Sequence, residues 1–118
     1  MKVLVCGGRQ YDDAATLASR LSEINRDHAI TEIIEGGAAG ADTLARKFGE
    51  HEGIPVRTFP ADWDTHGRAA GPIRNRQMLE EGRPDLVVAF PGGRGTANMV
   101  KQARAAGVKV LEINKTFQ

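Results

Sequence analysis

The sequence predicts an α/β domain in which a five-stranded parallel sheet carries helices on both faces. Three observations favour this class. Five short apolar runs alternate along the chain with four segments of helical periodicity. This alternation is typical of parallel sheets covered on both sides. Glycine-rich turns follow three of the runs, and 118 residues provide one core, so residues 1–118 are expected to form a single domain.

The first half of the chain contains two strand–helix units. The expected elements are, in order, a strand at 2–6, a helix at 13–26, a strand at 31–35 and a helix at 40–52. Asp12 or Asp13 is the expected cap of the first helix, because an aspartate oxygen there accepts from free backbone N–H groups. Both helices have an apolar face, formed by Ala14, Leu17, Leu21 and Ile24 in the first and by Ala41, Leu44, Ala45 and Phe48 in the second.

The second half continues the alternation after one irregular connection. The expected elements are a strand at 55–59, an irregular segment at 60–70, a helix at 71–82, a strand at 85–90, a helix at 96–106 and a strand at 109–113. Val100 and Ala103 form the inward side of the last helix. The irregular segment is the longest connection, and such segments in compact domains are usually functional or disordered.

The strand order follows from the connections. Right-handed crossovers with one reversal of direction give 3-2-1-4-5 as the simplest arrangement. The first and fourth strands then flank the point of reversal. Loops after the carboxyl ends of parallel strands face one side of the sheet, where ligands bind. A ligand site is therefore expected among the loops after the first, second and fourth strands.

Composition excludes several classes of function. The net charge of +1 leaves no electrostatic footprint for nucleic acid as a main partner. The lone Cys6 forms no internal disulfide, and no group of cysteines and histidines has zinc spacing, so no metal site is expected. No apolar run approaches the length of a membrane span, and the N-terminus does not resemble a signal peptide. The expectation is a cytoplasmic protein without a membrane partner.

The three glycine-rich loops are the strongest functional signal. Glycine lets the backbone come close to a ligand and point N–H groups at its oxygens, and the following helix adds a positive dipole end. The alternative is that these glycines only close tight strand-to-helix turns. The candidate ligand-binding residues are Gly7, Gly8 and Arg9 in the first loop, Gly36, Gly37, Ala38, Gly40 and Asp42 in the second, and Pro91, Gly92, Gly93, Arg94, Gly95 and Thr96 in the third.

Three further candidates lie around the irregular segment. Trp63 either stacks on a nucleobase or plugs the edge of the sheet. Arg74 and Asn75 fall in the first turn of the helix predicted at 71–82. Arginine there opposes the helix dipole, which favours a role in binding phosphate or carboxylate, and asparagine can contact a ribose or a base edge.

Several other polar residues have two interpretations. Thr96 either caps the last helix or touches phosphate. Asp42 either bonds a ribose hydroxyl or is a first-turn acid favoured by the helix dipole. The group of Asp62, Asp64 and His66 is better explained as solvated loop charge than as a base or a metal site. Cys6 is expected to be a buried, inert thiol.

A family resemblance runs through nearly the whole chain. The motifs are Gly36-Gly-Ala-Ala-Gly-Ala-Asp42, Ala61-Asp-Trp63, Gly67 with Ala70-Gly71, Arg74-Asn75 with Met78, and Pro91-Gly-Gly-Arg-Gly-Thr96. In this order they resemble the YspA-related branch of the SLOG superfamily. The resemblance implies a Rossmann-like three-layer fold and binding of nucleotides or nucleotide derivatives. It also implies self-association, because related proteins pair through helices.

One departure from the superfamily pattern concerns catalysis. The LONELY GUY phosphoribohydrolases in the superfamily release cytokinin bases from nucleoside monophosphates, and their Pro-Gly-Gly-x-Gly-Thr motif ends with a catalytic glutamate three positions after the threonine. This chain has Met99 at that position, whereas Arg74 matches their catalytic arginine. A thioether cannot assist cleavage of an N-glycosidic bond. The departure favours binding over this hydrolysis, unless Asp42, Asp62 or Asp64 supplies the carboxylate.

The functional expectation is therefore a domain that binds a nucleotide or a nucleotide-derived ligand, such as a nucleoside phosphate, ADP-ribose or an NAD-related molecule, without a cofactor. The first alternative is a hydrolase that cleaves the N-glycosidic bond of a nucleotide. The second is a single-stranded nucleic-acid binder like the DNA-processing protein of the same superfamily. The low aromatic content and the near-neutral charge argue against this last interpretation.

Overall fold

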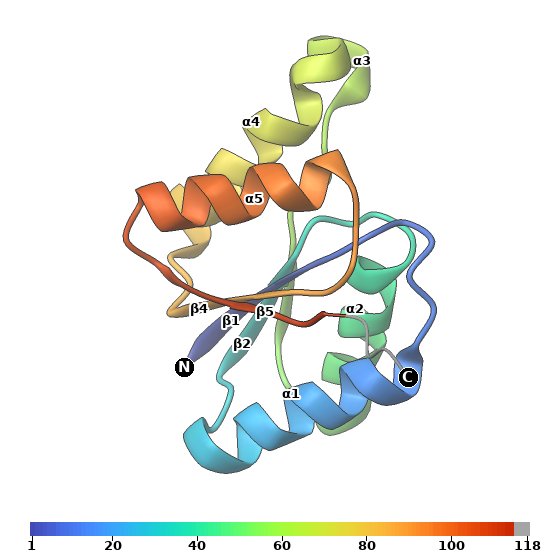
Figure 1. Ribbon diagram of the computed structural model, residues 1–118, viewed down its shortest axis with the longest axis vertical. Helices are drawn as coiled ribbons and strands as arrows, with labels where there is room; N and C mark the ends of the chain where they lie inside the picture. The colour runs from blue at the N-terminus through green and yellow to red at the C-terminus, as the bar shows by residue number, and fades with distance from the viewer. Residues whose placement is uncertain (115–118) are drawn as a thin grey trace.

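The computed structural model describes residues 1–114, so the last four residues of the predicted domain lie outside the described part. A five-stranded parallel sheet forms the middle layer, with α1 and α2 on one face and α4 and α5 on the other (Figure 1). The elements are β1 Lys2–Cys6, α1 Ala14–His28, β2 Glu32–Glu35, α2 Ala41–Glu52, β3 Val56–Thr58, α3 Trp63–His66, the 3₁₀ turn η1 Gly67–Ala69, α4 Ala70–Gln77, the π-helical turn η2 Met78–Gly82, β4 Leu86–Ala89, α5 Arg94–Ala105 and β5 Lys109–Glu112.

The predicted strand order is confirmed as β3-β2-β1-β4-β5 with every pair parallel. In the register, Leu4 of β1 lies between Ile34 of β2 and Val87 of β4. These central strands are buried on both faces, which is why they read as continuous apolar runs in the sequence. The sheet grows from β1 first toward β3 and then, from β4, toward the other edge. The loops after β1 and β4 therefore lie side by side at the carboxyl end of the sheet.

Alternate residues of the strands supply two separate cores. Val3, Val5 and Ile33 face α1 and α2, where they pack with Leu17, Leu21 and Phe48. Leu4, Ile34 and Val87 face α4, η2 and α5, where they pack with Met78, Met99 and Ala103. The predicted inward residues of the helices are confirmed except for Ala14, which is exposed because it begins α1 beyond the edge of the core.

Helix beginnings follow the expected chemistry in one case and depart from it in another. Asp13 caps α1, and its Oδ1 accepts from the N–H of Thr16 at 3.0 Å. Of the two interpretations of Thr96, the capping of the last helix is wrong, because α5 begins two residues earlier and its cap is Gly93, which has no side chain. Arg94 is thereby the first residue of α5 rather than a loop residue.

The segment predicted to be irregular at 60–70 is mostly helical, which corrects that prediction. Asp62 accepts from the N–H of Thr65 at 3.1 Å and starts α3, which continues through η1 directly into α4. The sequence does not predict α3 and η1 because these short turns bury no apolar stripe. Because α4 starts at Ala70, Arg74 lies in its second turn, not in the first turn as predicted. Among the described residues, no helix is both long and apolar enough to cross a membrane.

Candidate functional site

A cavity of about 600 Å³ opens at the carboxyl ends of β1, β2 and β4. Its walls come from the loops after these strands and from the segment that runs from α3 into α4. The predicted site residues that line it are Gly7, Arg9, Ala38, Asp42, Trp63, Arg74, Asn75, Gly93, Arg94, Gly95 and Thr96. Residues from all three glycine-rich loops therefore meet around one space, as the strand order requires.

Six predicted site residues do not line this cavity: Gly8, Gly36, Gly37, Gly40, Pro91 and Gly92. Four of them pack the loops against one another. The N–H of Gly8 donates to the carbonyl of Pro91 at 2.9 Å. A Cβ on Gly40 would lie 2.2 Å from the carbonyl oxygen of Gly8, and one on Gly92 would lie 2.6 Å from the amide nitrogen of Gly8. For these glycines, close approach of backbone to backbone explains the residue type.

Some lining residues were not singled out from the sequence as ligand contacts. Arg68, Gly71, Pro72, Met78 and Asn98 line the cavity, as does the Cys6 thiol. Arg68 lies in the η1 turn, between α3 and α4. The sequence does not predict this turn, so it does not show that Arg68 lies at the cavity. Asn98 lies one turn into α5, so the position of α5 relative to the sheet decides its role.

The beginning of α5 is the part of the cavity best suited to an anion. Gly93, Arg94, Gly95 and Thr96 line the cavity, and no side chain caps this helix. The first N–H groups of a helix have no partner within the helix, and the dipole makes that end positive. Helices α1 and α3, by contrast, satisfy these groups with Asp13 and Asp62. An oxyanion in the cavity would meet free N–H donors at α5.

Four arginines line the same cavity without a carboxylate partner. Within residues 1–114, none of Arg9, Arg68, Arg74 and Arg94 forms an ion pair, whereas five other arginines do, Arg20, Arg46, Arg57, Arg76 and Arg104. Asp42 is the one acid among the described lining residues. A cluster of unpaired guanidinium groups beside free helix N–H groups favours a ligand with several negative charges.

Arg74 is held in place by two hydrogen bonds. Its Nη1 donates to the carbonyl of Gly36 at 2.5 Å, and its Nε donates to Oδ1 of Asn75 at 3.0 Å. Burial lowers the pKa of its guanidinium, Asp42 opposes this effect, and the charge of Arg9 adds to it. Arginine stays charged in proteins, so the remaining donors present a fixed positive charge to the cavity.

Asn75 serves as a bridge between α4 and α5. Its side chain is buried, and its Nδ2 donates to the carbonyl of Gly95 at 3.2 Å and to Oδ1 of Asn98 at 3.1 Å. With Oδ1 accepting from Arg74, the amide is occupied by protein partners on both ends. Asn75 thus positions Arg74 beside the start of α5, a role that differs from the predicted contact with a ribose or base.

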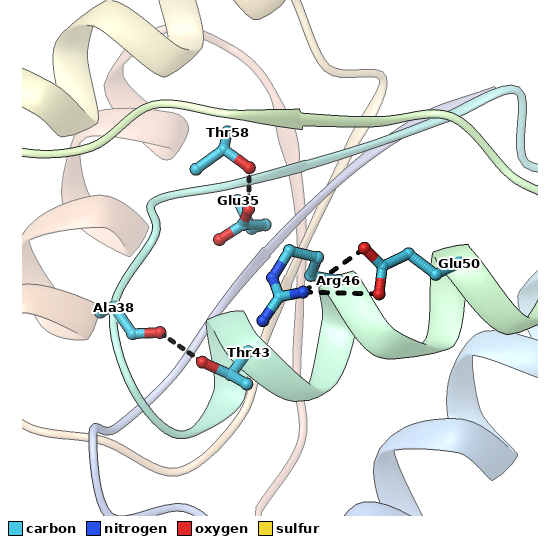
Figure 2. A network of polar contacts seen from close by, with 6 residues as sticks. All are labelled: Glu35, Ala38, Thr43, Arg46, Glu50 and Thr58. Atoms are coloured by element: carbon cyan, nitrogen blue, oxygen red, sulfur yellow. Dashed lines mark hydrogen bonds and ion pairs between the residues drawn. The ribbon is translucent and has the colours of Figure 1, made fainter.

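In the loop after β2, two backbone N–H groups already donate to carboxylates of the protein itself. The N–H of Gly37 donates to Oε1 of Glu35 at 2.6 Å, and the N–H of Ala38 donates to Oδ2 of Asp42 at 3.1 Å. Figure 2 shows Glu35 also accepting from the hydroxyl of Thr58, and Thr43 donating to the carbonyl of Ala38. This loop consequently keeps fewer free N–H groups than the start of α5.

Burial governs the chemistry of Asp42. Asp42 is 6% exposed, and burial raises the pKa of its carboxyl group from 3.8 to about 6. The N–H of Ala38 and the charge of Arg74 oppose this rise, whereas Glu35 adds to it. Asp42 therefore titrates close to neutral pH, in the range useful for proton transfer.

Asp42 should make the protein less stable as the pH rises from about 4 to about 6. In this range the unfolded chain releases the proton and the folded chain keeps it, so the free energy of unfolding falls by roughly 3 kcal/mol. The variant Asp42→Asn lacks this titration. We expect the wild type to lose stability relative to Asp42→Asn over this range in urea unfolding, and a difference independent of pH would contradict the assignment.

Other groups with reactive side chains are placed less favourably. Burial raises the pKa of the Cys6 thiol to about 12, in keeping with the predicted inert cysteine. Asp62 and Asp64 do not line the cavity, and no group of three or more His, Cys, Asp or Glu in residues 1–114 is arranged to hold a metal ion. Met99 lies on the inner face of α5 and is fully buried in the core, so its side chain does not line the cavity.

Trp63 does not plug the sheet edge, which removes one of its two interpretations. Its side chain is 47% exposed, and Cζ of Arg9 lies 5.5 Å from the ring centroid. A Cβ on Gly71 would lie 3.5 Å from the far edge of the indole. The ring therefore stands at the rim of the cavity between the first loop and α4, with one face over an arginine.

The fold and the cavity define the class: a Rossmann-like α/β domain whose pocket lies where the strand order reverses. Comparison with known proteins names the family. The family model of the YspA, cpYpsA-related SLOG family matches residues 1–66. The Gene 61 protein of Mycobacterium phage D29 is 36% identical over an alignment of 118 residues. The alignment covers 93% of this chain and 94% of that protein. The chain belongs to the YspA, cpYpsA-related SLOG family.

A solved structure extends the likeness to the whole fold. DNA processing protein A (DprA) from Streptococcus pneumoniae superimposes with a TM-score of 0.79 at 18% identity, over 98% of this chain. The chain spans 51% of the DprA chain, about half its length. At this identity the likeness concerns the fold alone. The predicted family and fold class are confirmed.

Proposed function

We propose that this domain binds a nucleotide or a nucleotide-derived ligand, with a phosphate group at the start of α5. The observation that carries the proposal is the uncapped beginning of α5 beside four arginines without carboxylate partners. Free helix N–H groups and guanidinium groups recognise the same anion from two sides. Together they neutralise phosphate without a metal ion.

The rest of the cavity suits the organic part of such a ligand. Trp63 offers an exposed aromatic face at the rim, and Met78 and Cys6 add apolar surface deeper in the cavity. Asp42 is the one lining carboxylate and can accept a hydrogen bond from a ribose hydroxyl. A pocket of this size with a few convergent polar groups is typical of small-molecule sites.

Thermal unfolding with a panel of nucleotides tests the proposal. The panel should include nucleoside mono-, di- and triphosphates, ADP-ribose, NAD and cyclic nucleotides. A ligand at a hundred times its dissociation constant adds about 2.7 kcal/mol of stability, which raises the melting temperature by roughly 10 °C in a domain of this size. No shift with any member at millimolar concentration would contradict nucleotide binding.

Hydrolysis of the N-glycosidic bond is the second candidate, favoured by one observation. Asp42 lines the cavity with Arg74, and its pKa of about 6 permits a proton to be held or released near neutral pH. Product analysis of the same samples for free base tests this candidate. Base release that persists at full rate in Asp42→Asn would point to a contaminating enzyme, because Asp62 and Asp64 lie away from the cavity.

Single-stranded nucleic acid is a weaker candidate. The likeness to DprA concerns the fold, and the net charge of +1 provides little attraction for a polyanion. Four of the six arginines that form no ion pair within residues 1–114 line one cavity; Arg26 and Arg83 lie outside it. This distribution favours a compact anionic ligand over an extended strand.

A further inference from the structure

A second, smaller cavity of about 370 Å³ adjoins the first. It lies between the loop after β2 and the segment that leads from β3 into α3. Its own walls are built from small residues and proline: Gly36, Gly37, Ala39, Pro60 and Ala61. This accounts for Gly36 and Gly37, which do not line the first cavity.

The boundary between the two cavities is formed by residues that line both. These are Arg9, Ala38, Trp63 and Arg74. Arg9 lies over the indole of Trp63, and Arg74 is fixed to the carbonyl of Gly36. The charge of Arg9 acts on the guanidinium of Arg74, so two cations converge at the boundary. No acid lines the second cavity within residues 1–114.

The boundary is also close to the start of α5. Arg74 donates to Asn75, and Asn75 donates to the carbonyl of Gly95 in the first turn of α5. Two neighbouring groups of donors can therefore each bind a negative charge: the N–H groups at the start of α5, and the pair formed by Arg9 and Arg74. Beyond the second group lies a space with no charge of its own except these two arginines.

We propose that the two cavities together take a diphosphate ester with an organic group at each end. A nucleoside would occupy the first cavity, one phosphate the start of α5, the next phosphate the boundary, and a second sugar or nucleoside the smaller cavity. This inference rests on the proposed function and refines it. A mononucleotide leaves the second cavity to water. The exposed indole of Trp63 offers the second group an apolar surface.

Matched pairs of ligands test the inference by isothermal titration calorimetry. Each pair consists of a nucleoside diphosphate and the same diphosphate esterified to a sugar: ADP with ADP-ribose, GDP with GDP-mannose, and UDP with UDP-glucose. For the base that the first cavity accepts, we expect the esterified member to bind about tenfold tighter or more in the wild type. Equal affinity of the two members would overturn the inference and leave the proposed function intact.

Filling the second cavity should remove the difference. Ala61→Phe and Ala39→Phe each place a ring in that space, and both are expected to bring the esterified ligand to the affinity of the plain diphosphate, whose own binding stays within about twofold. Ala69→Phe is the control, because Ala69 is exposed in η1 and lines neither cavity. A preference that survives in both filled variants would overturn the inference. If no ligand of any pair binds, this inference fails, and the thermal-unfolding panel decides the proposed function separately.

Discussion

Replacing Arg74 with alanine is expected to abolish most of the stabilisation that a nucleotide gives. Hydrogen bonds to Asn75 and to the carbonyl of Gly36 fix the position of Arg74 in the cavity. Its replacement therefore removes a charge that is already oriented. A hydrogen bond to a charged group contributes about 1.5–3 kcal/mol, which corresponds to a dissociation constant roughly 10- to 100-fold higher. At a ligand concentration that gives the wild type about 2.7 kcal/mol, the variant would retain about 0.4 kcal/mol at the upper end. The shift in melting temperature would fall from roughly 10 °C to about 2 °C.

Two control variants separate the loss of a binding group from a general effect. Arg76→Ala removes an exposed arginine of the same helix that pairs with Glu80, so it should bind like the wild type. Arg74→Lys keeps a positive charge but not the planar guanidinium, so intermediate binding is expected. An unchanged thermal shift in Arg74→Ala would mean that the phosphate lies elsewhere. Circular dichroism without ligand checks that each variant is folded.

The sequence sufficed for the strands and the long helices because each of these elements carries its own local signal. Buried parallel strands read as apolar runs, and the run at Leu86–Ala89 is a clear case. Helix α1 combines an apolar face with an aspartate at its cap, so Asp13 was predictable. The handedness of crossovers then fixed the order of the strands. None of these steps needed a contact between distant residues.

The parts of the site that depend on distant contacts could not be predicted in this way. Glu35 reads as the polar end of a strand, yet it is buried and bonded to Thr58, 23 residues away. Its hydrogen bond to the N–H of Gly37 removes one of the donors that the glycine-rich loop had been expected to offer to phosphate. Asn75 was likewise assigned to the ligand, because nothing local reveals its partners on α5.

The glycines illustrate the same division. Ligand contact and tight turns are the two explanations for the glycine-rich loops, and the glycines that line the cavity differ from those that pack loop against loop. Gly7, Gly93 and Gly95 line the first cavity, whereas Gly8 and Gly40 lie where two loops touch. The motif alone does not distinguish them, since both groups are glycines of the same loops. Substitution does, because a methyl group at a loop contact affects folding rather than affinity.

Gly40→Ala is therefore expected to produce the largest loss of stability among single methyl additions to these loops. The backbone of Gly40 has φ 75° and ψ −124°, a region that residues with a Cβ avoid, at about 1–3 kcal/mol. In addition, the new Cβ would lie 2.2 Å from the carbonyl oxygen of Gly8 and 2.6 Å from the carbonyl carbon of Arg9. Both obstacles are backbone atoms, so relief requires the loops to separate. We expect a loss of about 3 kcal/mol or more in urea unfolding, a large part of the stability of an ordinary domain.

Gly53→Ala is the matched control for this prediction. Gly53 ends the same helix α2, with φ 72° and ψ 24°, and a Cβ there would meet no atom within 4 Å. Only the left-handed backbone opposes the methyl group, which amounts to about 1–2 kcal/mol. The difference between the two variants thus reports the contact between the first and second loops together with the less accessible ψ of Gly40. Equal losses would mean that these loops do not press on each other, and the cavity would then lack the rigid wall on which the placement of Arg9 depends.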